Sequence, residues 1–590
     1  MNPSPGALAD SCGPVSKSIN DVQGTETTSA LKGQNAQIRG VVSANLADAN
    51  GYAGFFIEAE SDARDSDPKT SEGLFISYPS AQALALGERV AISGKVEEIT
   101  FGESLLTSVQ ADATPARCGK TTLPPSLILS APPENWEALE GMRVRIDAPL
   151  SLTGNDELGR YGALRAAFGA RLSVPTQSAA PGPEARTLAM LNKQRMFIVD
   201  DLSLLENPQE IGYLGGPVQL KMPLRAGDQI SALEGVVDER FGSYRVQSAK
   251  PITLTRANPR PATPPLIDGR LKVASFNVLN LFNGDGLGSG FPTERGAKTL
   301  AAFERQKAKT LSAMTALNAD IYGLMEIEND GFGEESALAE LTRGLNQKVR
   351  DTRYDYVRVA SAKVGSDQIT SAIVYRRDKV KPIGGGMAQV NGPFSSGSRP
   401  PLLQAFEEIS SGEKFTLVVV HFKSKGGCPA ATRPGDQDSN DGQACFNLSR
   451  VEAADALLDG LQMNPSGLDD RDFLLIGDFN AYAQEDPMTT FKNANYLNLG
   501  DYALEPEYSY VYSGEAGSLD HALVSESLSG QVKAHAVWHI NADEPSNFEY
   551  DGFGRDNLND RNWFAPDPYR SSDHDPLLIG LDLNSAPILQ

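Results

Sequence analysis

A proline-rich stretch near the middle of the sequence separates two parts that have different patterns. Residues 258–265 read Asn-Pro-Arg-Pro-Ala-Thr-Pro-Pro. Proline has no backbone N–H and a fixed φ, so this stretch is stiff and cannot join the interior of a sheet. A chain of 590 residues also exceeds what one hydrophobic core normally organises. We therefore expect several domains, with a linker at residues 258–268.

The part before the linker predicts two related β modules. Strand-like runs separated by turn residues predict a small barrel within residues 1–125. Residues 126–257 repeat part of this pattern. Gly-Glu-Arg-Val-Ala-Ile-Ser-Gly-Lys-Val at 87–96 is echoed by Gly-Asp-Gln-Ile-Ser-Ala-Leu-Glu-Gly-Val-Val at 227–237. We expect each module to be a small barrel.

The part after the linker, residues 269–590, predicts an α/β domain. Apolar residues recur at helical spacing in 294–317 and 338–349. Apolar strand-like runs lie at 271–278, 320–327, 371–376, 415–422, 472–479 and 576–583. This alternation is typical of sheets covered by helices.

Polar residues stand where these strands end or begin. They are Asn277, Glu326, His421, Asp478, Asn480, Asp520, Asp573 and His574. One such residue alone is more often a cap, a turn residue or part of a satisfied surface pair than a catalytic group. Several of them at one end of packed strands can converge on a rigid cleft.

The ordered set of motifs resembles the endonuclease/exonuclease/phosphatase superfamily, which includes pancreatic deoxyribonuclease and the abasic-site endonucleases. The motifs, in the family order, are Ser275-Phe276-Asn277, Met325-Glu326, His421, Gly477-Asp478-Phe479-Asn480, Ser518-Leu519-Asp520 and Ser572-Asp573-His574-Asp575-Pro576. The resemblance covers about 310 residues. It implies a four-layered, deoxyribonuclease-like α/β sandwich as the catalytic domain. The two β modules before the linker resemble OB-folds.

The resemblance also implies roles for these residues. Glu326, Asn277 and Asp573 would supply oxygen ligands to Mg²⁺ or Mn²⁺. His574, oriented by Asp520, would activate or orient the attacking water.

The remaining site residues would act on the phosphate. His421 and Asn480 would donate to its non-bridging oxygens, and Asp478 would bind water, metal or the leaving group.

Weaker matches surround this set. Ser398-Arg399-Pro400 resembles a segment in which Arg399 contacts phosphate, although an exposed turn arginine is nearly as good an interpretation. Asp367 is a loose candidate for the acidic partner of His421. After Glu326 the chain has Ile-Glu-Asn at 327–329, where pancreatic deoxyribonuclease has an arginine that enters the minor groove. We therefore expect any duplex binding to differ in detail.

The four cysteines form two plausible pairs, Cys12 with Cys118 and Cys428 with Cys445. Such pairs fit disulfides in an oxidising compartment, while four free thiols remain the alternative. No signal peptide is visible in the residues from Met1 to Gly6, so the chain is either cytosolic or has lost a leader. We favour a secreted, monomeric protein that does not cross a membrane, because no apolar run is long enough to span one.

The net charge and one polar loop leave more than one ligand possible. A net charge of -23 is unusual for a protein that binds nucleic acid, so a local basic strip and bound cations would have to admit the phosphate. The polar loop at 436–442 faintly resembles a Ca²⁺ loop, but its glycine is displaced and no closing glutamate follows. A solvated loop beside the substrate is the better interpretation, with Ca²⁺ as the alternative.

Three hypotheses for function follow. The first is a secreted, metal-dependent nuclease that hydrolyses extracellular DNA or RNA, since the arrangement of modules resembles that of bacterial extracellular nucleases. The second is a phosphomonoesterase or a sphingomyelinase-type phosphodiesterase, because the superfamily hosts both. The third, a non-enzymatic binding or adhesion protein, predicts a broken catalytic set, whereas every core position is filled here.

Overall fold

The computed structural model describes residues 12–46, 53–78, 84–219, 221–248, 250–350, 353–395, 397–468, 471–503, 505–551 and 563–583. The chain forms two compact units. The first combines the described parts of Met1–Arg171, Asn192–Met222 and Ala226–Asn258; the second combines those of Leu172–Leu191, Pro223–Arg225 and Pro259–Gln590. Within the described ranges, no helix is long and apolar enough to span a membrane. The residues Met1–Gly6, on which the leader question depends, lie outside these ranges.

The first unit begins with a closed ring of strands. Five of them pair in the order β1-β2-β3-β5-β4, and β1 pairs again with β4. β3 and β5 run parallel, whereas the other neighbours are antiparallel. The bounds are β1 Asn35–Asn45, β2 Gly54–Glu58, β3 Gly73–Ser77, β4 Glu88–Phe101, β5 Ser104–Ala111 and β6 Ala116–Lys120.

The barrel forms because its strands alternate between buried and more exposed side chains. In β4, Val90, Ile92 and Val96 are buried and lie in one apolar core with residues of β1, β2 and β3. This is the period-two pattern of a strand with one covered face. A disulfide joins Cys12 to Cys118 with 5.3 Å between the two Cα atoms, which confirms that predicted pair.

The second sheet of this unit has nine strands in the order β16-β13-β9-β10-β12-β15-β14-β8-β7. Their bounds are β7 Leu127–Leu129, β8 Arg143–Ile146, β9 Leu150–Gly154, β10 Leu164–Phe168, β12 Met196–Asp200, β13 Gln229–Ser231, β14 Leu233–Arg240, β15 Ser243–Gln247 and β16 Thr253–Thr255. Both echoed sequence segments therefore form strands. The module boundary at residue 125 and the OB-like resemblance of both modules stay predictions.

A buried glutamate connects the two sheets of the first unit. Glu140 is 1% exposed, and its Oε1 accepts hydrogen bonds from Gln23 Nε2 at 3.3 Å and from the backbone N–H of Thr107 at 3.2 Å. Its backbone carbonyl accepts from Ser71 Oγ. Burial, and then the charge of Glu137, raise the pKa of Glu140 well above its ordinary value of 4.5. The folded protein therefore keeps this carboxyl protonated where the unfolded chain ionises it.

Because folding takes up that proton, we expect Glu140 to destabilise the first unit increasingly as pH rises above 4.5. Glu140→Gln removes the ionisation. The free energy of unfolding of the variant should gain on that of the wild type between about pH 5 and pH 8, by up to about 1.4 kcal/mol per pH unit. Urea unfolding at several pH values measures this difference. Glu26→Gln, which changes an exposed glutamate, is the control, and equal pH profiles for Glu140→Gln and wild type would contradict the expectation.

The second unit contains two six-stranded mixed sheets. The first has the order β19-β20-β18-β17-β30-β29 and the second the order β21-β22-β23-β24-β28-β25. The bounds in the first are β17 Leu271–Leu281, β18 Ile321–Glu328, β19 Tyr354–Tyr356, β20 Ile369–Arg376, β29 Val532–Val537 and β30 Leu577–Leu581. Those in the second are β21 Val380–Ala388, β22 Leu402–Glu408, β23 Lys414–His421, β24 Phe473–Asp478, β25 Leu497–Asn498 and β28 Asp520–Val524.

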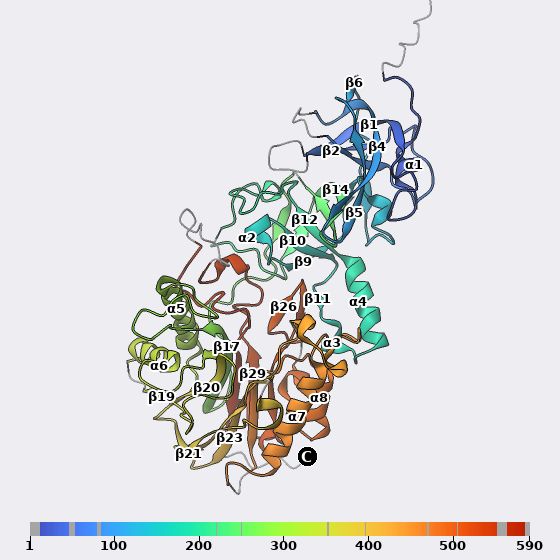
Figure 1. The fold of residues 1–590 in the computed structure, drawn as a ribbon. Coiled ribbons are helices and arrows are strands. Elements are labelled where there is room, and N and C mark those ends of the chain that lie inside the picture. Colours follow the sequence, from blue (N-terminus) through green and yellow to red (C-terminus); the bar gives the residue numbers. More distant parts are fainter. Residues whose placement is uncertain are drawn as a thin grey trace, which may run out of the picture. The chain divides into compact units, whose positions relative to one another are not determined.

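These sheets pack face to face with helices outside them. One apolar core, which includes Val273, Ile321, Val419 and Ile476, lies between the sheets. Helices α5 (Leu300–Leu317) and α6 (Ala337–Lys348) pack on the first sheet, and α7 (Asn447–Gln462) and α8 (Asp486–Asn493) pack on the second (Figure 1). This confirms the predicted four-layered α/β sandwich.

The remaining described elements are helices outside these two layers and three short strands. The helices are α1 Ile19–Gln23, α2 Leu158–Tyr161, α3 Pro175–Ser178, α4 Pro183–Arg195 and α9 Glu526–Ser529. The strands β11 Leu172–Ser173, β27 Glu515–Gly517 and β26 Tyr510–Tyr512 form a small sheet in which β11 runs parallel to β27. Residues 172–191 and 223–225 thus belong to the second unit although they precede the proline-rich linker. The sequence patterns did not predict this.

Candidate active site

Three of the predicted site residues form one row across neighbouring strands. His421 ends β23, Asp478 ends β24 and Asp520 begins β28. The strand register places His421 beside Asp478 and Asp478 beside Asp520. All three side chains are buried. Because paired residues on adjacent strands project to the same face, the sheet itself sets the spacing of this row.

The facing sheet contributes Asn277 and Glu326 at irregular positions. The pairing of β18 with β20 shifts register between Leu324 and Ile327, and Glu326 within this shift has φ +67°. This left-handed conformation is unusual for a glutamate and is typical of strained residues at functional sites. Asn277 Nδ2 donates to Glu326 Oε1 at 3.1 Å and to Asp478 Oδ2 at 3.3 Å.

A glycine and an asparagine shape the turn after β24. Gly477 has φ +138°, and a Cβ there would lie 2.0 Å from the carbonyl oxygen of Val420. A side chain at this position would push β24 away from β23. Asn480 has φ +50° and donates its backbone N–H to Asp478 Oδ1 at 2.8 Å. Its Nδ2 donates to the carbonyl of Phe422 at 3.3 Å, and this hydrogen bond orients the side-chain amide.

His574 and Asp520 form a buried pair. His574 Nδ1 lies 2.7 Å from Asp520 Oδ2, and Ser509 Oγ donates to the same oxygen at 2.6 Å. His574 Nε2 lies 3.9 Å from Asp478 Oδ2. A carboxylate on Nδ1 fixes the imidazole so that Nε2 faces the other site residues.

The loop that carries His574 is held by a buried asparagine. Asn541 is 0% exposed; its Nδ2 donates to the carbonyl of His574 at 2.6 Å, and its Oδ1 accepts from the backbone N–H of Ser571 at 2.8 Å. Asp575 binds the segment around Asn541 in turn. Its Oδ1 accepts the backbone N–H groups of residues 540–542 at 2.7 to 3.1 Å. These bonds hold Asp573 and His574 at the start of β30.

Arg399 lies beside His421. Arg399 is 7% exposed, and its Nη1 donates to the carbonyl of Phe422 at 2.8 Å and lies 3.4 Å from His421 Nε2. The interpretation of Arg399 as an exposed turn residue is therefore wrong. Asp367, the loose candidate for a partner of His421, instead accepts from Arg399 Nε at 2.9 Å and pairs with Arg295 at 3.2 Å.

The ionisation of the site follows from its burial. Burial, and then Asp573, raise the pKa of Glu326 above its ordinary value. Burial raises the pKa of Asp478 to about 7 against the opposing charge of His574, and the charges of Asp520 and Glu326 add to the rise.

The pKa values of the two histidines shift in opposite directions. Burial alone would lower the pKa of His574, but the charges of Asp520, Asp573 and Asp478 raise it well above its ordinary value. Burial, and then Arg399, lower the pKa of His421 well below its ordinary value, so this imidazole is neutral at neutral pH.

The donor set fits a hard cation bound through few protein ligands. Glu326 and Asp573 interact electrostatically, and a divalent cation between them would relieve the repulsion that raises the pKa of Glu326. The described residues contain no group of three or more His, Cys, Asp or Glu that could hold a metal ion. Mg²⁺ is nevertheless often held by one or two carboxylates and water.

Asn277 differs from the predicted ligand. Its Oδ1 accepts the backbone N–H of Leu279 at 3.1 Å, so its nitrogen, not its oxygen, faces Glu326 and Asp478. In this structure Asn277 braces Glu326, and its role as a metal ligand stays a prediction.

The loop between Cys428 and Cys445 is closed by a disulfide with 5.5 Å between the Cα atoms, which confirms the second predicted pair. Within it, Asp436 accepts the backbone N–H and the Oγ of Ser449 at 2.8 and 2.9 Å, in the first turn of α7. This carboxylate therefore accepts one of the backbone N–H groups that the first turn of α7 leaves without a partner inside the helix. The Ca²⁺ hypothesis gains no ligand set from the described residues.

Several residues near the site carried no sequence signal. The ring of Tyr510 lies 4.6 Å from that of His574 at an interplanar angle of 31°. Ser509 binds Asp520, Arg295 pairs with Asp367, and Lys423 lies 4.1 Å above the ring of Phe446. None of them ends a recognisable strand motif.

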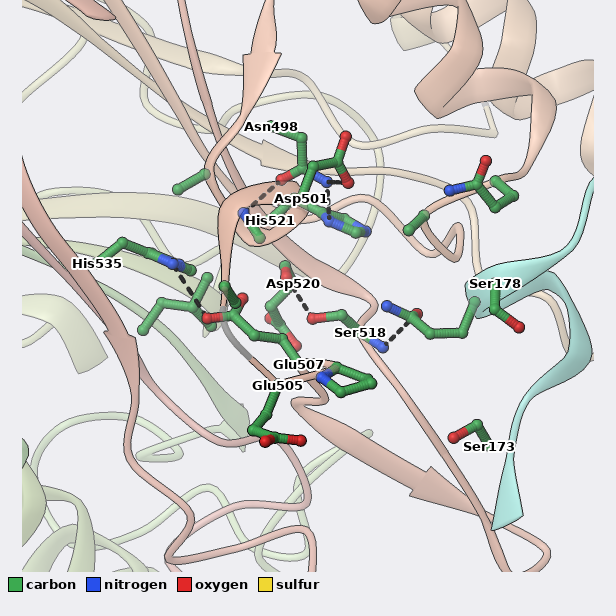
Figure 2. Close-up of a pocket in the computed structure, with 18 residues that line it drawn as sticks. Ser173, Ser178, Asn498, Asp501, Glu505, Glu507, Ser518, Asp520, His521 and His535 are labelled. Carbon is green, nitrogen blue, oxygen red and sulfur yellow. Dashed lines mark hydrogen bonds and ion pairs between the residues drawn. The ribbon is translucent and has the colours of Figure 1, made fainter. Parts of the chain in front are cut away.

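A hollow of about 480 Å³ lies against Asp520 and Ser518 (Figure 2). Its wall includes the carboxylates Asp501, Glu505 and Glu507, and His535 Nδ1 lies 3.1 Å from Glu507 Oε1. A wall of this sign repels anions.

Comparison with known proteins places the site in context. The model of the endonuclease/exonuclease/phosphatase family matches residues 274–574, slightly more than half of the 590-residue chain. A search of curated proteins found no match.

Similar solved structures were found as well. They include the human Nocturnin catalytic domain with bound sulfate (16% identity, 52% of this chain and 93% of that chain covered, TM-score 0.32). A mannosyl-6-phosphatase from Bacteroides thetaiotaomicron is 17% identical, over 53% of this chain and 99% of that chain, with TM-score 0.33. TDP2 of D. rerio, complexed with a single-strand DNA product, is 13% identical, over 52% of this chain and 97% of that chain, with TM-score 0.31.

Proposed function

Because this chain belongs to the endonuclease/exonuclease/phosphatase family, whose members hydrolyse phosphoester bonds and generally depend on a divalent metal ion, we propose that it is a secreted nuclease that cleaves extracellular DNA or RNA. The observation that carries the proposal is the His574–Asp520 pair at 2.7 Å, with His574 Nε2 turned toward Asp478. The two disulfides support an oxidising, extracellular setting.

The proposed chemistry assigns one task to each group. The neutral form of His574, which the raised pKa of the imidazole disfavours, orients the attacking water through Nε2 and takes its proton, while Asp520 holds the opposite nitrogen. His421 and Asn480 donate N–H groups to the phosphoryl oxygens as negative charge develops. Mg²⁺ or Mn²⁺ held by Glu326 and Asp573 would polarise the phosphoryl oxygen and stabilise the leaving alkoxide.

A basic edge supports a substrate with more than one phosphate. Arg295, Arg399 and Lys423 lower the pKa of His421 together, which places their charges around it. In a protein with net charge -23 this local cluster gives a polyanionic chain a place to bind.

A substrate panel with a paired set of variants tests the proposal. Supercoiled plasmid, linear DNA, RNA and sphingomyelin vesicles are each incubated with Mg²⁺, Mn²⁺, Ca²⁺ or a chelator. We expect nicking of the plasmid with Mg²⁺ or Mn²⁺ and none with the chelator. Release of phosphate or phosphocholine with intact plasmid would instead support the phosphatase or sphingomyelinase alternative.

Glu326→Gln is expected to lower the Mg²⁺-dependent rate by at least about 100-fold, since a metal ion supplies several kcal/mol to the transition state. Glu328→Gln is the matched control, because Glu328 lies two residues further along β18 and accepts the backbone N–H of Asn283 at 2.9 Å. Equal losses in the two variants would speak against a metal ligand at residue 326.

A further inference from the structure

The hairpin of β26 and β27 places an aromatic ring directly beside the catalytic histidine. The ring of Tyr510 in β26 lies 4.6 Å from that of His574, tilted by 31°, and packs against an apolar cluster that includes Leu519. Strands β26 and β27 pair in register from Tyr510 with Gly517 to Tyr512 with Glu515. The two turn residues, Ser513 and Gly514, both have positive φ, which is typical of a tight hairpin turn.

A second tyrosine continues this surface. Tyr512 lies two residues after Tyr510, and residues two apart in a strand project to the same face, about 7 Å along it. Tyr512 is 65% exposed. An isolated exposed tyrosine needs no explanation. Tyr512, however, follows Tyr510 on the same face of the strand, and Tyr510 lies beside His574.

The opposite end of the site is cationic. From His574 Nε2 the contacts run to Asp478 Oδ2 at 3.9 Å, from that oxygen to His421 Nε2 at 3.6 Å, and from there to Arg399 Nη1 at 3.4 Å. The site is therefore polarised, with flat aromatic rings beyond His574 and guanidinium groups beyond His421.

We propose that Tyr510 and Tyr512 form an aromatic subsite on which the nucleobase next to the scissile phosphodiester stacks. This inference rests on the proposed function and names the chemistry of its substrate. A base presents a flat π-face to either ring, and stacking tolerates any base sequence. A lipid chain would require a broad apolar surface, whereas the partner surface here is a pair of phenol rings on a polar hairpin.

The test compares substrates that contain a single phosphodiester bond. Dithymidine monophosphate is compared with two analogues in which a tetrahydrofuran abasic unit replaces the nucleoside on one side or the other, and diuridine monophosphate extends the comparison to ribose. With Tyr512→Ala we expect kcat/KM for dithymidine monophosphate to fall about 5- to 100-fold. The analogue that lacks the stacked base should start lower and change less than about twofold.

Matched variants separate stacking from a general loss of structure. Tyr512→Phe and Tyr512→Trp should retain most of the activity because both keep a flat ring. Tyr502→Ala removes another exposed tyrosine of the same unit, at 69% exposure, and should leave all substrates unaffected.

Each possible result bears on the proposal. Equal losses on base-bearing and abasic substrates, or no loss at all in Tyr512→Ala, would overturn the aromatic subsite while hydrolysis itself continues. Failure of the wild-type protein to cleave any of these diesters with Mg²⁺ or Mn²⁺ would instead overturn the proposed function. A fall of the same size for diuridine monophosphate in Tyr512→Ala would support the subsite on RNA as well, because stacking tolerates any base.

Discussion

His574→Ala is expected to lower kcat for plasmid nicking by about 10²- to 10⁴-fold, the usual contribution of a general acid–base group. The loss follows from the pair with Asp520, because no other described nitrogen is held in the same way at the same place. Circular dichroism should show an unchanged fold, since the strands on both sides of the site do not depend on the imidazole.

Two further variants sharpen this expectation. Asp520→Asn should cause a smaller loss by itself, and the double variant His574→Ala/Asp520→Asn should be no worse than His574→Ala alone, because residues that act as a unit are not additive. His535→Gln changes a histidine that pairs with Glu507 rather than with the site and should retain the wild-type kcat. Wild-type activity in His574→Ala would rule out the proposed mechanism.

Arg225→Ala is expected to destabilise the second unit by on the order of 3 kcal/mol, because it leaves buried carboxylates without their main cation. Arg225 is 1% exposed; it pairs with Glu544, lies 3.3 Å from Asp543 and donates to the carbonyl of His539 at 2.8 Å. Arg260 also binds Glu544, at 2.6 Å, which keeps the expected loss at the lower end of the range for broken buried pairs.

The measurement can be restricted to the unit in question. The chain has three tryptophans, of which Trp136 lies in the first unit and Trp538 and Trp563 lie in the second. In a Trp136→Phe background, tryptophan fluorescence during urea unfolding therefore reports on the second unit. Arg433→Ala, which breaks an exposed pair with Glu452 in the same unit, should change the stability of that unit by less than about 0.5 kcal/mol. An equally small effect of Arg225→Ala would show that the buried pairs are dispensable.

The sequence predicted the parts of this fold that depend on local patterns. The strands that end at His421 and Asp478 are apolar runs closed by polar residues, and both residues lie at the ends of neighbouring strands as predicted. The helix expected at 294–317 begins only at Leu300, because Thr299 caps it by accepting the backbone N–H of Ala302. Such boundaries depend on a single hydrogen bond that periodicity does not record.

The features that the sequence did not predict depend on contacts between distant residues. Thr176 Oγ1 donates to the buried Glu485 across 309 positions, and Arg225 reaches Glu544 across 319. Neither segment has a periodicity that identifies its partner. Tyr510 likewise lies beside His574 in a strand that pairs with β27, and β27 in turn pairs with β11, which lies before the linker.

These long sequence separations determine how much time passes between the synthesis of one partner and that of the other. A ribosome adds about 5 to 20 residues per second, so Thr176 and Arg225 are synthesised roughly 15 to 60 seconds before their partners exist. During that interval the strands β13 to β16 of the first unit, which follow Arg225 in the sequence, are completed first. The site is likewise completed late, because the pair of Asp520 and His574 can form only after residue 574 has been synthesised.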